Sequence, residues 1–143
     1  MSNEYKDCQN DLRTIFDLKM WETMWLYDGW KNTFIPQMMD ELFDVLGPYV
    51  EDFIVHQIKE KYGSLTVYWG WKHRDYTDEE HQDIQELDSA VKNIIDKYRK
   101  ISDHTCVQCG ENATFLSDGW VVPWCDSCRD RKKGVFGIIK DDD

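Results

Sequence analysis

Four of the five cysteines lie in two C-x-x-C pairs, which are the residues of this sequence with the clearest chemistry. Cys106 and Cys109 form the first pair, Cys125 and Cys128 form the second, and fifteen residues separate the pairs. A C-x-x-C turn brings two thiolates to one side of a tight loop, and two such pairs at this spacing are typical of a tetrathiolate zinc site. The pattern predicts one structural Zn²⁺ held by all four cysteines.

Two alternatives to zinc follow from the same cysteines, namely two disulfides or a redox-active dithiol. A redox motif of the thioredoxin type is a single C-x-x-C after a strand in a βαβ context, and this sequence shows no such context. Four thiolates also complete a closed tetrahedron that leaves no position for water, which favours structural over catalytic zinc. His104, two residues before Cys106, stays open as a replacement ligand or a support for the site.

Residues 102–133 are expected to form a zinc ribbon or treble clef packed on the rest of the chain. Gly110 suits the left-handed turn that a zinc knuckle needs. The segment between the pairs reads as a short hairpin that carries the second knuckle at its end. The basic residues Arg129, Arg131, Lys132 and Lys133 are interpreted as a solvated edge, and residues 134–143 as a tail.

Residues 1–101 are expected to form an α+β core in which helices pack on a β-hairpin or small antiparallel sheet. Two helices occupy the N-terminal part, the second beginning at Pro36 and ending at Gly47. Apolar residues then alternate over 53–71, which predicts a hairpin whose turn is longer than two residues. A long helix follows over 77–101, because Thr77 and Glu80 form a capping-box pattern ahead of an apolar stripe.

The charge balance limits the partners that this chain can have. It carries 28 acidic and 17 basic side chains, for a formal net charge of −11. General nucleic-acid binding needs clustered Lys and Arg, so it is not expected. No apolar stretch approaches membrane-spanning length, and no signal peptide is recognised. We expect a cytoplasmic protein, because thiolates bind metal in a reducing compartment.

Motifs of known enzyme classes are not found. None of the four histidines is followed two positions later by Glu, as a zinc deaminase requires. There is no H-E-x-x-H, no phosphate-binding glycine loop and no nucleophile elbow. The question of an enzyme stays open, and the residues favour a non-catalytic protein.

The order of several features resembles a family of small uncharacterised proteins from bacteria and their phages. The likeness spans roughly residues 29–128. It is carried by Gly29-Trp30, the helix from Pro36, the run Lys59-Glu60-Lys61-Tyr62-Gly63-Ser64-Leu65 leading into Tyr68, the long helix, and the paired cysteines with Gly119-Trp120 between them. This chain has Thr66 where the family often has Arg. The resemblance implies the fold, the zinc ligands and a bacterial or phage origin, and it supplies no function.

Two binding functions are consistent with these residues. The first is a protein that occupies a basic surface on a bacterial or host protein, as a phage-encoded inhibitor or modulator would in the host cytoplasm. The candidate contact residues are Asp78, Glu79, Glu80, Asp83 and Glu86 on the long helix. The ordinary interpretation of these acids is the solvated face of an amphipathic helix.

The second function is capture of a nucleotide-like anion by cations that lie beside aromatic residues in the hairpin region. The candidate residues are Lys59, Lys61, Tyr68 and Arg74. The alternative interpretation is that these cations neutralise neighbouring carboxylates while the aromatic residues fill the core.

Overall fold

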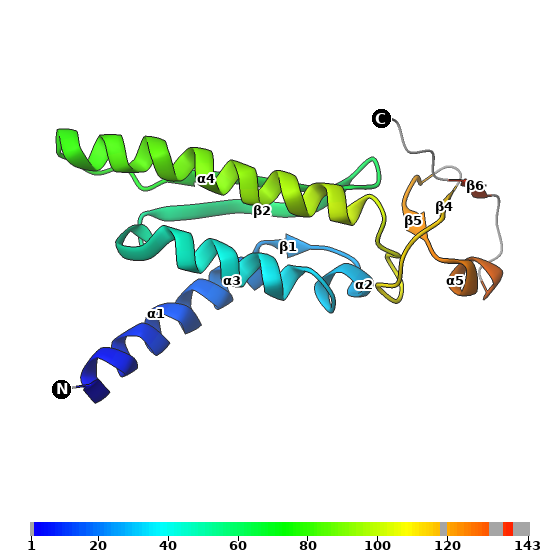
Figure 1. The fold of residues 1–143 in the computed structure, drawn as a ribbon, viewed down its shortest axis with the longest axis horizontal. Coiled ribbons are helices and arrows are strands. Elements are labelled where there is room, and N and C mark those ends of the chain that lie inside the picture. Colours follow the sequence, from blue (N-terminus) through cyan, green and yellow to red (C-terminus); the bar gives the residue numbers. More distant parts are fainter. Residues whose placement is uncertain (1, 118–119, 132–135, 139–143) are drawn as a thin grey trace.

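The computed structural model describes residues 2–117, 120–131 and 136–138, with the backbone alone for 2–10 and 136–138. Its elements follow one another along the chain (Figure 1). They are α1 (Ser2–Glu22), β1 (Met24–Trp25), α2 (Asp28–Lys31), α3 (Ile35–Leu46), the 3₁₀ helix η1 (Gly47–Tyr49), β2 (Phe53–Lys61), β3 (Ser64–Trp71), α4 (Asp78–Ser102), β4 (Phe115–Ser117), β5 (Pro123–Trp124), α5 (Asp126–Arg131) and β6 (Phe136–Ile138). The expected α+β class is confirmed.

The main sheet has the strand order β1-β2-β3 and is mixed. β2 and β3 form the predicted antiparallel hairpin, with Phe53 opposite Trp71 and Lys61 opposite Ser64. β1 adds a short parallel strand on the other side of β2, where Trp25 pairs with Lys59. The register shifts between Val55 and Gln57, a β-bulge that places His56 as the extra residue.

The hairpin turn corrects the sequence prediction, because its connection is only two residues long. Tyr62 has φ 54° and Gly63 has φ 85°, and Lys61 pairs directly with Ser64. Positive φ at both central residues is the signature of a type I′ turn, which matches the twist of the strands. The lysines and Glu60 before the turn, interpreted as part of a loop, belong to β2.

Helices α3 and α4 cover one face of the sheet (Figure 1). The indole N–H groups of Trp69 and Trp71 both donate to Asp88 Oδ1 of α4 at 3.0 Å, which fixes the side on which α4 lies. The predicted capping box is present, since Glu80 N–H donates to Thr77 Oγ1 at 3.1 Å and Thr77 N–H donates to Glu80 Oε1 at 2.9 Å. α4 therefore begins and ends within one residue of the predicted helix.

The core lies between this helical layer and the covered face of the sheet. α3 begins at Ile35 with Pro36 in its first turn, and Gly47, at φ 51°, follows its last residue, as expected. Several large side chains are completely or almost completely buried: Met20, Trp30, Ile35, Met38, Leu42, Leu46, Ile58, Leu65 and Val91. Burial of an aliphatic side chain contributes about 1.5–3 kcal/mol, so this set is the main source of stability.

The cysteine-bearing segment occupies one end of the molecule, beyond the C-terminal end of α4 (Figure 1). Its own sheet has the order β5-β4-β6. β6 falls within residues 134–143, which were expected to be a tail, and pairs antiparallel with β4. The described part of this segment therefore extends to Ile138.

Candidate metal centre

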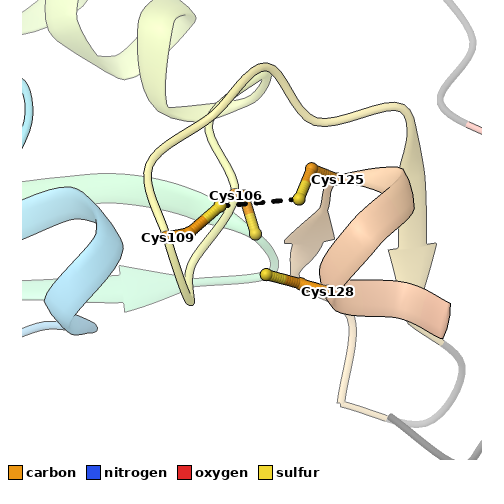
Figure 2. Close-up of side chains that lie close together, drawn as sticks. All are labelled: Cys106, Cys109, Cys125 and Cys128. Carbon is orange, nitrogen blue, oxygen red and sulfur yellow. Dashed lines mark hydrogen bonds between the residues drawn. The ribbon is translucent and has the colours of Figure 1, made fainter. Parts of the chain in front are cut away.

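The four cysteines of the two C-x-x-C pairs converge on one point. Their Sγ atoms all lie within 4.8 Å of one another (Figure 2). Four sulfurs at about 2.3 Å from a central Zn²⁺ would be about 3.8 Å apart, so the observed cluster has the size of a tetrathiolate site. This is the one group of at least three Cys, His, Asp or Glu ligand atoms with metal-site spacing found among the described residues, and His104 is not part of it.

The first knuckle runs from Cys106 to Gly110. Gly110 N–H donates to Cys106 O at 3.0 Å, and Cys106 N–H donates to Glu111 O at 2.8 Å. Gly110 has φ 85°, which confirms the predicted left-handed turn. A Cβ at this position would lie 2.0 Å from Thr33 Cγ2, so the turn also requires a glycine for close packing.

This knuckle is docked on α2 through the backbone. Gly29 N–H donates to Val107 O at 2.8 Å, and the buried indole N–H of Trp30 donates to Thr105 O at 2.8 Å. A Cβ on Gly29 would lie 2.2 Å from Cys106 O. The first two ligands are therefore positioned by residues from the N-terminal third of the chain, a role that sequence reasoning did not assign to Gly29 or Trp30.

The second pair of ligands lies at the start of α5. The β4–β5 hairpin reverses the chain, Phe115 pairing with Trp124, and brings Cys125 opposite the first knuckle. α5 then begins at Asp126, and Cys128 lies in its first turn. The order of knuckle, hairpin and helix is that of a treble clef, one of the two arrangements that the sequence predicted.

The charges within the cluster call for a cation. Burial acts to raise the pKa of Cys106, but hydrogen bonds from the backbone N–H groups of Cys109, Cys125 and Gln108 outweigh it and lower the pKa to about 7. Burial and the neighbouring thiols raise the pKa of Cys128 to about 12. Burial and neighbouring thiols thus oppose ionisation of Cys128, and a bound divalent cation would supply the charge that four thiolates need.

One of the two described arginines after the second pair contacts the centre, although Arg131 is exposed and Arg129 half-buried, as a solvated edge would be. Arg131 Nη2 lies 3.4 Å from Cys128 Sγ and donates to it. Arg129 stacks on Phe115, with its Cζ 3.8 Å from the ring centroid. Lys132 and Lys133 lie outside the described residues. Arg131 therefore offsets part of the negative charge of a tetrathiolate site.

Glu60 joins the tip of the main hairpin to the cysteine-bearing segment. Its Oε1 accepts from Trp120 Nε1 at 2.9 Å, and its Oε2 accepts from Gly63 N–H at 2.8 Å. Tyr27 Oη also lies 3.5 Å from Oε1. Val121 O is 3.0 Å from the position of a Cβ on Gly63, so the turn and this segment are in close contact.

The predicted acidic residues divide into two groups. Asp78, Glu79 and Glu86 are exposed on α4. Glu80 binds Arg74 at 3.0 Å in addition to its cap, and Asp83 accepts from Tyr49 Oη at 2.7 Å. The bond to Asp83 raises the pKa of Tyr49 to about 12. Two of the five carboxylates are thus occupied within the molecule.

The predicted anion-binding residues lie at opposite ends of the hairpin. Lys59 Nζ is 5.7 Å from the centroid of the Tyr68 ring, and Lys61 is next to the turn. Arg74 follows the other end of β3, where its guanidinium binds Asp52 at 2.7 and 3.1 Å. Since a strand rises about 3.3 Å per residue, the eight-residue length from Lys61 to Phe53 separates these ends by about 26 Å. The structure brings together Lys59 and Tyr68, but not Arg74.

Comparisons of this chain with protein-family models, with curated proteins and with solved structures found no match. The resemblance to small bacterial and phage proteins therefore stays a prediction. Within the described residues, no helix is both long enough and apolar enough to span a membrane.

Proposed function

We propose that this chain is a non-catalytic binding protein, stabilised by one Zn²⁺, that presents the acidic N-terminal half of α4 to a basic surface of a partner protein. The observation that carries the proposal is the exposure of Asp78, Glu79 and Glu86 on one helix, in a chain whose net charge is −11. Complementary charge speeds association and orients the encounter. If the chain is encoded by a phage, the partner would be a host protein of defence or nucleic-acid handling, in the host cytoplasm.

Zinc is the metal that best suits the centre. Thiolates are soft ligands, and a set of four gives the tetrahedral site that zinc prefers in structural centres. Cys106, Cys125 and Cys128 are buried, so the bound ion would be enclosed by its ligands. Such an ion would hold the two knuckles together, and it would have no open position for a substrate.

Metal analysis tests the zinc assignment. We expect one zinc per chain by inductively coupled plasma mass spectrometry, and a tetrahedral thiolate spectrum when Co²⁺ replaces it. Cys125→Ser should lower the zinc content, whereas Cys8→Ser, which is not part of either C-x-x-C pair, should leave it at one per chain. Iron or no metal in the purified protein, or equal zinc in the Cys125 variant, would contradict the assignment.

A pull-down from bacterial lysate tests the binding function. The tagged, zinc-loaded protein should retain a specific polypeptide, identified by mass spectrometry, that is released as salt screens the charges. The double variant Glu79→Lys with Glu86→Lys should lose most of this retention. Glu22→Lys, an exposed charge reversal on α1, is the matched control and should retain it. Equal retention by the wild type and the double variant would reject the acidic face.

A second candidate function is the capture of a nucleotide-like anion, and the position of Lys59 over the Tyr68 ring favours it. A cation next to an aromatic ring offers a phosphate partner and a stacking surface together. Calorimetric titration with a nucleoside triphosphate tests it. Lys59→Ala with Lys61→Ala should abolish the heat of binding, and a wild type that gives no heat would reject this candidate.

A further inference from the structure

The main sheet has a second face, on the side away from α3 and α4. Side chains alternate along a strand, so residues paired with one another point to the same side. Ile58 and Val67 point into the core, and their neighbours Lys59 and Thr66 therefore point outward. The outward set, called the open face here, comprises Trp25, Ile54, Gln57, Lys59, Thr66 and Tyr68.

Aromatic rings on the open face are accessible to solvent. Trp25 is 75% exposed and Tyr68 is 42% exposed. Single exposed apolar side chains are ordinary, whereas exposed aromatic side chains gathered on one face can mark an interaction site. By the register of β1, β2 and β3, Trp25 is beside Lys59, and Tyr68 is two residues from Thr66 on the far strand.

The charge of the open face is opposite to that of the molecule. The six residues named above include Lys59 and no carboxylate, and the exposed Lys61 follows Lys59 two residues later on β2. Glu60, between the two lysines, is directed elsewhere, to Trp120 and the Gly63 amide. The exposed side chain of His56 lies over Gly70, with its Nε2 atom 3.1 Å from the position of a Cβ there.

The spacing of the two rings favours a polymer over a single nucleotide. Strands are about 4.8 Å apart and rise about 3.4 Å per residue, so the Cα atoms of Trp25 and Tyr68 are about 12 Å apart, with Lys59 between them. Two bases of one strand that are separated by a third can stack on two rings at this separation, while a phosphate between them meets the lysine. A duplex keeps its bases stacked inside and would meet only the two lysines of this face in a chain of charge −11.

We propose that the open face binds single-stranded nucleic acid, with bases stacked on Trp25 and Tyr68 and phosphates paired with Lys59 and Lys61. The proposal rests on the second candidate function and names its ligand. It also gives the molecule two chemically different sides, since the acidic residues of α4 belong to the layer that covers the opposite face.

The test is fluorescence anisotropy of a labelled 15-nucleotide oligothymidylate with the zinc-loaded full chain at 50 mM salt. We expect saturable binding. The logarithm of the association constant should fall linearly with the logarithm of the salt concentration, with a slope of about −1.4, because two neutralised phosphates contribute about −0.7 each. Trp25→Ala and Tyr68→Ala should each weaken binding by about 5- to 150-fold, the effect of one stacked base. Trp21→Ala and Lys92→Ala remove exposed residues of α1 and α4 and should leave affinity unchanged.

Competition separates failure of this inference from failure of the second candidate function. Thymidine monophosphate should compete much more weakly than the oligonucleotide. If thymidine monophosphate competes as well per nucleotide as the oligonucleotide, the second candidate function is supported and the assignment to single-stranded nucleic acid is overturned. If neither ligand binds, both fail. Equal binding of polyglutamate, blocked by the same variants, would also overturn the inference, because it would show a surface selective for charge alone.

Discussion

Gly29 N–H donates a 2.8 Å hydrogen bond to Val107 O, which places the backbone of α2 directly against the first cysteine knuckle. A methyl group at Gly29 would meet Cys106 O at 2.2 Å. The metal ligands and the core thus share one packed interface.

Gly29→Ala should move the first knuckle. Overpacking of this kind costs about 1–3 kcal/mol, and we expect that loss in urea denaturation together with weaker zinc retention against a chromophoric chelator. Gly47→Ala is the control, because a Cβ there has no neighbour within 4 Å and its cost comes only from the positive φ. Equal zinc retention by Gly29→Ala and the wild type would show that α2 does not position the ligands.

Removal of the metal should loosen the C-terminal segment first. Structural zinc sites contribute apparent binding energies of about 10 kcal/mol or more, which are coupled to folding. Addition of a strong chelator should therefore lower the melting temperature and expose the buried indole of Trp124 to solvent. The check is circular dichroism and tryptophan fluorescence with metal content measured in parallel. An unchanged melting curve in a sample shown to be free of metal would rule out a structural role.

Glu60→Gln should separate the hairpin tip from the β4–β5 loop. The amide keeps one acceptor oxygen but directs its NH₂ group at a second donor, either Trp120 Nε1 or the Gly63 amide. Loss of a hydrogen bond to a charged group costs about 1.5–3 kcal/mol where it is buried and less here, since Trp120 is exposed. Hydrogen exchange at the Gly63 amide should accelerate. Glu79→Gln, on α4, should leave that amide unchanged.

Asp52 should make the stability depend on pH below 4. The hydrogen bond from Arg74 lowers the pKa of Asp52, so the ionised form is favoured by folding. The stability that ionised Asp52 adds is fully present above its unfolded-state pKa of 3.8. It is lost as the pH falls through its lower pKa in the folded state. Asp52→Asn should lower the free energy of unfolding by about 1–3 kcal/mol at pH 7.

The same variant should show a smaller loss between pH 4 and pH 2 than the wild type, measured by urea denaturation at each pH. Asp44→Asn removes an exposed carboxylate and serves as the control. If the free energy of unfolding falls equally between pH 4 and pH 2 in the wild type and in Asp52→Asn, the ion pair does not contribute to stability.

Local patterns were sufficient for several features. Cysteine spacing identified the four residues that cluster at metal-site distances, because all four are fixed by two short turns and one hairpin. Thr77 and Glu80 identified the start of α4, because a capping box is formed by neighbours in sequence. Each of these features depends on contacts within a few residues or on one hairpin.

Features that depend on distant contacts were missed. β1 is only two residues long and is defined by its pairing with Ile58 and Lys59. Two residues are too few to show an alternating hydrophobic pattern in the sequence. Arg74 was grouped with the lysines because it is near them in sequence, whereas the strand between them carries it to the far end of the hairpin. The need for glycine at position 29 arises from Cys106 O, which the local sequence does not reveal.

The docking of the first knuckle on α2 also has a consequence for synthesis on the ribosome. Trp30 and Gly29 emerge well before residues 105–107, which accept the indole hydrogen bond and the backbone hydrogen bond. Until those residues emerge, the Gly29 N–H and the Trp30 indole N–H do not have these partners and must bind water. The packing around α2 can therefore be completed only after the segment that carries the first cysteine pair has been synthesised.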